Sequence, residues 1–134
     1  MFKTILFPLD QSRESREAAE VAIQLAKAHQ SDRIILLSVM EEAESAHSPA
    51  MASHDAIAEL LKTAQQLFEE SGLKAEALER SGKPAFVICD VADELPADVI
   101  IMGCRGTGLT EEGAADSVTN RVINLSPCPV LIVP

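Results

Sequence analysis

The chain of 134 residues contains no tryptophan or tyrosine and only four phenylalanines. Its hydrophobic core must therefore be aliphatic, and it lacks the aromatic side chains on which single-stranded nucleic acids usually stack. Basic residues are also scarce, because 11 lysines and arginines face 21 acidic residues, which gives a formal net charge of −10. This charge argues against a surface that binds DNA, RNA or an anionic membrane.

Metal-ligand spacing and long hydrophobic runs are missing as well. The three cysteines Cys89, Cys104 and Cys128 form no C-x-x-C pair, which favours reduced thiols in a cytosol over disulfides or a metal site. We expect Cys89 and Cys128 to be packing residues, whereas Cys104 lies in a glycine-rich loop where a redox role is open. Apolar runs such as Val99–Met102 are far too short to span a bilayer. The N-terminus has no signal-peptide shape, so we expect a cytoplasmic protein.

Strand and helix patterns alternate along the whole chain. Short apolar runs bounded by turn residues are typical of buried strands. They predict five strands, at Lys3–Leu9, Arg33–Met40, Leu73–Glu79, Asp98–Met102 and Val130–Val133.

Four helices are expected between these strands. Ser12 is a plausible N-cap of the first, and Gly72 and Pro84 are expected to end the second and begin the third. The fourth is expected to start around Asp116–Thr119. Helical spacing places Ile57, Leu60, Leu61, Ala64, Leu67 and Phe68 on one stripe of the second helix, and Val118, Val122 and Leu125 on one face of the fourth. The polar stretch Glu41–Ser53, with Pro49, is expected to be a mobile loop.

This alternation predicts a single three-layer α/β domain, residues 1–134, with a parallel sheet and helices on both faces. The weak third strand fits an edge, so we expect the flavodoxin-like strand order 3-2-1-4-5. Ligands of such sheets bind at the carboxyl ends of the strands, where the direction of the connections reverses. The predicted place is the crevice between strands 1 and 4, which Asp10 and Gly103 follow directly.

A glycine-rich loop, containing Gly103, Gly106, Gly108 and Gly113, joins the fourth strand to the last helix. Glycine allows the backbone to approach a ligand closely, and loop amides and a helix dipole together favour an anion. The stretch therefore predicts a phosphate site.

In these features the chain resembles the universal stress protein family. Ile5–Ser15 matches that family's opening strand, acidic residue and helix start. Ser81–Gly106 matches its third helix and fourth strand, and Ser117–Pro134 matches its closing helix and strand. The resemblance covers essentially the whole chain, and the order and spacing of the pieces make it specific.

Many members of that family bind ATP through a G-x2-G-x9-G-[ST] motif, in which Gly103, Gly106 and Ser117 match and Asp116 replaces the third glycine. The resemblance implies that Asp10 lies near the phosphates and near a Mg or Mn ion, and that Arg105 contacts phosphate. It also implies that the chain dimerises through residues 129–134. The nucleotide-binding residues it implies are Pro8, Asp10, Val39, Met102, Gly103, Arg105, Gly106, Ser117, Val118 and Thr119.

Asp116 leaves the function open between three hypotheses. As an N-cap its carboxylate would accept the amides that a phosphate would use, and it would repel a triphosphate. A metal held between Asp10, Asp116 and phosphate would reverse that effect. The first hypothesis is that the chain is an adenine-nucleotide-binding stress-response module. The second is that it is a nucleotide-free protein that acts through dimerisation and protein partners. A slow ATPase is the third hypothesis, and no catalytic residue beyond Asp10 suggests itself.

Overall fold

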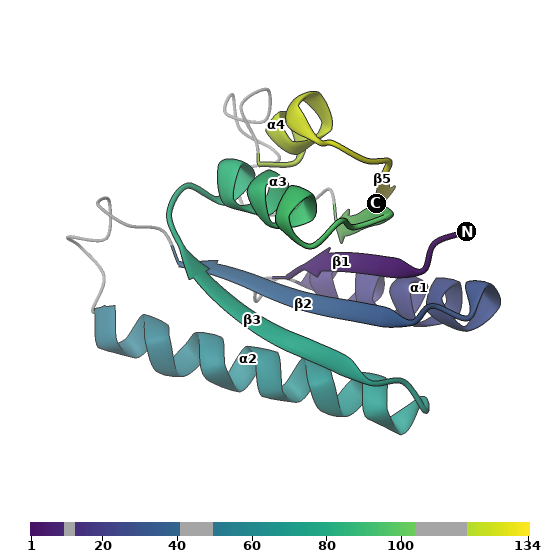
Figure 1. The fold of residues 1–134 in the computed structure, drawn as a ribbon. Helices are drawn as coiled ribbons and strands as arrows, with labels where there is room; N and C mark the ends of the chain where they lie inside the picture. Colours follow the sequence, from purple (N-terminus) through teal and green to yellow (C-terminus); the bar gives the residue numbers. More distant parts are fainter. Residues whose placement is uncertain (10–12, 41–49, 104–117) are drawn as a thin grey trace.

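A computed structural model describes residues 1–9, 13–40, 50–103 and 118–134 of the chain (Figure 1). Helices and strands alternate as predicted. In chain order they are β1 (Thr4–Pro8), α1 (Arg13–His29), β2 (Arg33–Met40), α2 (Ala50–Glu70), β3 (Ala75–Ser81), α3 (Pro84–Glu94), β4 (Val99–Gly103), α4 (Val118–Leu125) and β5 (Val130–Val133).

The five strands form one sheet in the order β3-β2-β1-β4-β5, and every strand pair is parallel. The predicted fold and strand order are therefore confirmed. β1 lies in the centre, where Thr4 pairs with Arg33 and Pro8 pairs with Leu37 of β2. The weakly apolar β3 lies at one edge of the sheet, and β5 lies at the other.

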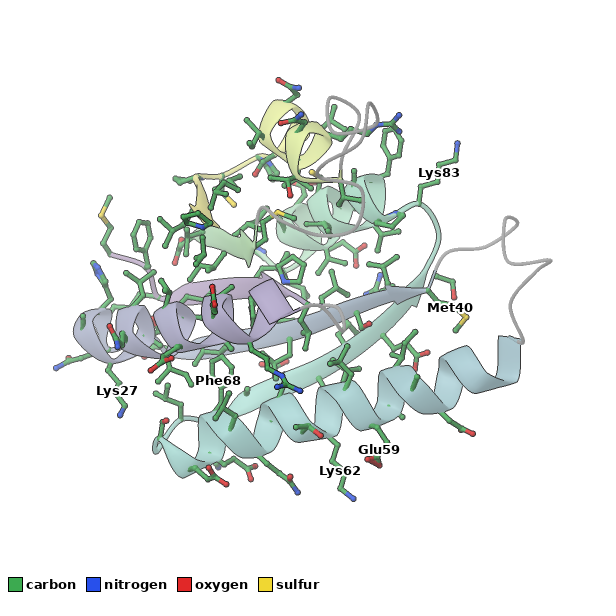
Figure 2. The ribbon with its side chains drawn as sticks, turned by 180° about the vertical axis from the view of Figure 1, so that it is seen from behind. Lys27, Met40, Glu59, Lys62, Phe68 and Lys83 are labelled. Atoms are coloured by element: carbon green, nitrogen blue, oxygen red, sulfur yellow. The ribbon has the colours of Figure 1, made fainter. Side chains whose placement is uncertain are left out.

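Two aliphatic layers enclose the sheet, because successive side chains of a strand point to opposite faces. One layer joins Ile5 and Phe7 of β1 to α1 and α2. The other joins Leu6 of β1 to α3 and to Val122 of α4. In Figure 1, α3 lies in front of the sheet and α1 lies behind it. Phe68 of α2 is fully buried between its helix and the sheet (Figure 2). Leu67, which helical spacing places on the same apolar stripe, is 41% exposed, so the sheet covers only part of that stripe.

Helices α1 and α2 end in the same way, with one residue in the left-handed conformation. After α2, Gly72 has φ +84°, and the Leu73 amide donates to the Phe68 carbonyl at 3.0 Å. After α1, Gln30 has φ +52°, and the Ser31 amide donates to the Ala26 carbonyl at 2.9 Å. Glycine suits this position because it has no Cβ, and its role at Gly72 was predicted. Glutamine adopts it only at a cost in free energy.

A carboxylate joins the amino ends of two central strands. The Asp98 carboxylate, just before β4, accepts hydrogen bonds from the Lys3 and Thr4 amides, both at 2.9 Å. The Asp98 amide in turn donates to the Thr4 carbonyl at 2.8 Å. Asp98 therefore fixes the alignment of β1 and β4 at the amino ends of the strands, whereas the site is predicted at their carboxyl ends.

The third strand begins two residues later than predicted, at Ala75 instead of Leu73. Leu73 belongs to the end of α2, since its amide bonds to the Phe68 carbonyl and its side chain packs on the α1/α2 layer. Leu73 therefore ends a helix, although its hydrophobic side chain suggested a strand residue. The ends of β1 and β4 shift by a single residue.

The predicted loop Glu41–Ser53 overlaps the start of α2, which begins at Ala50. The prediction is therefore wrong for residues 50–53, and residues 41–49 lie outside the described part. Pro49 was taken as a loop signal, but proline is compatible with the beginning of a helix and only disrupts its interior. The alanines and methionine that follow it are strong helix formers.

Candidate functional site

The carboxyl edge of the sheet is the candidate site, because the chain connections reverse direction there. From β1 the chain continues to β2 and β3 on one side and reaches β4 and β5 on the other. Such a reversal leaves a crevice between the two central strands, where ligands of open α/β sheets bind. The arrows of β1, β2 and β3 all point to this edge, on the left of Figure 1.

Three of the predicted site residues lie on one face of this edge. Met102 belongs to the α3/α4 layer, and Val39 packs against that layer. Pro8 lies two residues beyond Leu6, which belongs to the same layer, so the strand period places it on the same face. Pro8 and Met102 are buried and Val39 is half-buried. Together they form an apolar surface across β2, β1 and β4 that lies within the α3/α4 layer.

The first turn of α4 is attached to the end of β4. The Thr119 hydroxyl donates a hydrogen bond to the Gly103 carbonyl, with 3.3 Å between Oγ1 and O. Val118, next to it, is 38% exposed. The structure therefore brings Gly103 and Thr119, with Val118 next to it, to the carboxyl end of β4, where the N-terminus of α4 lies.

The start of α3 also lies at the carboxyl ends of the strands, next to the end of β2. The Gly82 amide donates to the Met40 carbonyl at 2.9 Å, which joins the end of β2 to the turn before α3. Figure 2 shows Met40 and Lys83 at this end of the sheet, with Lys83 extending away from it. Lys83 is exposed, so the apolar surface beside it contains no cation from α3.

Four predicted site residues lie outside the described part of the chain. They are Asp10, Arg105, Gly106 and Ser117, and Asp116 and Cys104 also lie there. Their proposed contacts with phosphate and metal stay predictions. Among the described residues, no group of three or more His, Cys, Asp or Glu side chains could hold a metal ion.

The sequence analysis missed Ser38. It is 4% exposed and is the one buried polar or charged residue in the described part of the chain. It lies near the carboxyl end of β2, between Leu37 and Val39, so its side chain points to the face opposite to theirs. The signal was available, because Ser38 is the single hydroxyl in the apolar run RIILLSVM.

The last helix is only partly covered. Val118, Val122 and Leu125 have the spacing of one helix face, but only Val122 is fully buried, whereas Val118 is 38% exposed and Leu125 is 47% exposed. Most neighbours of α4 belong to α3, and Val122 is the one side chain of α4 that reaches the buried layer between α3 and the sheet.

The exposed apolar side chains of α4 and β5 form what we call the C-terminal surface: Val118, Ile123, Leu125 and Leu131. Within residues 118–134, Arg121 is the only charged side chain, although the whole chain has a net charge of −10. The opposite edge strand, β3, carries Glu76, which is paired with Arg33 at 2.7 Å. The strand β3 therefore carries charged side chains, whereas β5 carries none.

Two thiols lie beneath the C-terminal surface. Cys89 of α3 is buried, as predicted, and Cys128 is half-buried against the same layer. Burial raises the pKa of the Cys89 thiol and also raises the pKa of the Cys128 thiol. Both are free thiols, and protonated thiols are poor nucleophiles.

No helix in the described residues is long and apolar enough to cross a membrane.

Comparisons with known proteins agree with this architecture. The sequence model of the Universal stress protein family matches residues 1–134. Universal stress protein Sll1654 of Synechocystis sp. is 57% identical over 137 residues, covering 100% of this chain and 87% of the relative.

Among solved structures, universal stress protein UspA of Lactobacillus plantarum has a TM-score of 0.83 and 26% identity, covering 99% of this chain and 98% of that one. A universal stress protein solved in complex with cAMP has a TM-score of 0.80 and 25% identity, covering 98% and 97%. The match over the whole chain and the shared fold give one conclusion: this chain belongs to the universal stress protein family.

Proposed function

We propose that the chain is an adenine-nucleotide-binding module of the stress response, which works as a dimer in the cytoplasm. The observation that carries the nucleotide part is the junction of β4 and α4, where Thr119 is bonded to Gly103 beside the apolar surface of Pro8, Val39 and Met102. The base would lie on that surface, and the phosphates would lie toward the amides of the α4 N-terminus. The structure of a relative in complex with cAMP supports this class of ligand.

ATP with Mg or Mn is the form of ligand that we favour. Asp10 would hold the metal, and Arg105, Gly106 and Ser117 would contact the phosphates. Asp116 opposes this arrangement unless a metal lies between its carboxylate and the phosphates. Two charges about 4 Å apart interact by about 1–4 kcal/mol at effective dielectric constants of about 80 to 20. Since 1.4 kcal/mol is a factor of about ten in affinity, Asp116 decides whether binding is measurable.

Calorimetric titration of ATP and Mg²⁺ into the wild type and Asp116→Gly tests the nucleotide proposal. Asp32→Gly is the matched control, because it removes the same charge from an exposed turn at the opposite edge of the sheet. We expect Asp116→Gly to bind at least as tightly as the wild type, and Asp32→Gly to leave the affinity unchanged. If neither the wild type nor Asp116→Gly binds at millimolar ATP, the proposal is wrong.

A nucleotide-free protein that acts through dimerisation is the second candidate, and the C-terminal surface favours it. A chain of net charge −10 repels its copies except where acidic residues are absent. Residues 118–134 contain no acidic residue, and their apolar edge strand β5 pairs with β4 on one side and with no other described strand on its outer side. Pairing of residues 129–134 with a second copy would cover this edge.

Sedimentation of Leu131→Asp against Leu67→Asp tests the dimer. The two leucines are similarly exposed, at 38% and 41%, but Leu67 lies on α2 at the other side of the sheet. We expect Leu131→Asp to be monomeric at micromolar concentration and Leu67→Asp to sediment as the wild type does. A wild type that is only monomeric would refute the dimer.

An ATPase activity is the weakest candidate and would be slow. It would depend on Asp10, so phosphate release that is lost in Asp10→Asn would support it.

A further inference from the structure

Phe86, in the first turn of α3, is the one exposed aromatic side chain of the protein. All four phenylalanines lie in the described part of the chain, which has no tyrosine or tryptophan. Phe7 and Phe68 are fully buried and Phe2 is half-buried against the α1/α2 layer, whereas Phe86 is 48% exposed. Aromatic side chains are enriched among the residues that anchor protein interfaces. Phe86 therefore has the character of an interface anchor.

Two acidic side chains follow Phe86 on the same stripe of α3. Asp90 and Asp93 lie four and seven residues beyond it, so the three side chains project within about 60° of one another. All three are exposed, while Ile88 and Ala92 on the other side of the helix are buried in the α3/α4 layer. We call Phe86, Asp90 and Asp93 the α3 stripe. It is about 10 Å long, so it suits a partner segment of two to three helical turns.

The acidic residues of α3 are not placed where the helix favours them. Asp93 lies in the last turn, where the partial negative charge of a helix end disfavours an acidic residue. That turn contains no basic residue, and residues 84–98 contain four acidic residues and no lysine or arginine. Glu94 is paired with Arg80 at 3.4 Å, whereas Asp90 and Asp93 have no ion pair with a residue that the structure describes. A cationic segment on the α3 stripe would relieve this repulsion.

We propose that the α3 stripe binds a basic, amphipathic helical segment of a protein partner. An apolar side chain of that segment packs on Phe86, and lysine or arginine residues farther along pair with Asp90 and Asp93. The net charge of −10 attracts such a segment at long range and speeds the encounter. Lys83, exposed before the first turn of α3 (Figure 2), repels the basic end and so favours one orientation.

This inference depends on neither nucleotide binding nor the dimer, because the α3 stripe shares no residue with the proposed nucleotide site or the C-terminal surface. Truncation of an aromatic anchor commonly has a large effect on affinity, so we expect Phe86→Ala to weaken binding at least about fivefold. Exposed ion pairs contribute less and are screened by salt. We expect Asp90→Asn combined with Asp93→Asn to weaken binding about two- to tenfold in low salt, and less in high salt.

Fluorescence anisotropy of the full chain with a labelled peptide of leucine and lysine at helical spacing measures the affinity. Peptides with glutamate in place of lysine, or serine in place of leucine, should bind weakly. Leu67→Ala is the matched control for Phe86→Ala, because Leu67 is 41% exposed on α2. Asp55→Asn combined with Glu59→Gln is the control for the aspartates, because it removes two charges from exposed positions of α2. Both controls should bind the peptide like the wild type, and circular dichroism checks that all variants fold.

The outcomes decide between a specific surface and general attraction. Binding within twofold of the wild type by Phe86→Ala, or by the double variant of Asp90 and Asp93, overturns the proposal. An equal loss in the double variant of Asp55 and Glu59 also overturns it, since net charge alone would then explain the binding. A wild type that does not bind the leucine–lysine peptide has the same consequence. If Phe86→Ala changes the sedimentation of the chain alone, a second copy covers the stripe and the assigned partner is wrong.

Discussion

Replacing Gln30 with glycine should stabilise the fold, although the same change within a helix destabilises one. Gln30 follows α1 with φ +52°, a conformation that costs an ordinary L-residue about 1–2 kcal/mol. Glycine removes this cost but adds about 0.4–1 kcal/mol of conformational entropy to the unfolded chain. The difference predicts that Gln30→Gly raises the free energy of unfolding by about 0.5–1 kcal/mol.

Gln24→Gly is the control, because Gln24 is exposed in the interior of the same helix. There glycine has no left-handed strain to relieve, so we expect a loss of about 0.5–1 kcal/mol. The reverse exchange, Gly72→Gln, should also destabilise: Gly72 has φ +84° and a Cβ there would meet no atom within 4 Å. Its cost is therefore conformational and about 1 kcal/mol.

Urea denaturation at one fixed protein concentration measures all three variants, since self-association would change the apparent stability. A change of midpoint with an unchanged slope reports the free energy of unfolding. If Gln30→Gly were neutral or destabilising while Gln24→Gly behaved as expected, strain at Gln30 would be refuted as the explanation.

Three further predictions follow from contacts and pKa shifts. Asp98→Ala leaves the Lys3 and Thr4 amides without their acceptor, so chemical denaturation should show a loss of about 1–3 kcal/mol in the free energy of unfolding; an unchanged midpoint would contradict the role of Asp98 in joining β1 and β4. Burial raises the pKa of the Cys89 thiol in the folded protein. The stabilisation that comes from this protonated thiol is therefore complete below the pKa of the unfolded chain, about 8.5, and is lost as the pH rises through the pKa of the folded protein. Between pH 7 and pH 10 the melting temperature should fall less steeply for Cys89→Ala than for the wild type. The hydrogen bond from Arg33 lowers the pKa of Glu76, so this pair stabilises above about pH 4.3 and loses its effect as pH falls through the folded pKa. As the pH falls in acid, the melting temperature should show the loss of this ion pair in the wild type but not in Glu76→Gln.

The sequence predicted the sheet well because its buried strands are nearly uniform in hydrophobicity. Arg33–Met40 and Val130–Val133 were predicted with the bounds that the structure has. Both are bounded by polar or turn residues, so their ends are visible in the sequence. The order of the strands followed from right-handed crossovers and from the weak hydrophobicity of β3.

Other features were hidden because they depend on tertiary packing. Leu73 looks like a strand residue but caps α2. Val118 and Leu125 have helical spacing, yet α4 packs on α3 through Val122 alone among its eight residues. Periodicity shows which side chains share a face of a helix, but it does not show whether another element covers that face.

The candidate site was predicted in part. Its place at the carboxyl edge follows from topology, and the hydrogen bond between Thr119 and Gly103 gives it geometry. Ser38 was not singled out, although it is the single hydroxyl in an apolar strand, because a lone serine in a sequence does not show whether it is buried. Topology placed Asp10 at the end of the first strand beside the predicted site, and resemblance supplied its role near phosphate and metal.

The bond between Asp98 and the start of β1 has a consequence for the order in which the chain folds during synthesis. β1 pairs with β2 on one flank and with β4 on the other. Between the end of β2 and the end of β4 the ribosome adds roughly 60 residues, which takes about 3–12 s at synthesis rates of about 5–20 residues per second. During that time the apolar flank of β1 has no native neighbour, and an unpaired strand edge is open to pairing with other chains. The emerging N-terminal half is therefore where a chaperone would be needed, before Asp98 and β4 close the sheet.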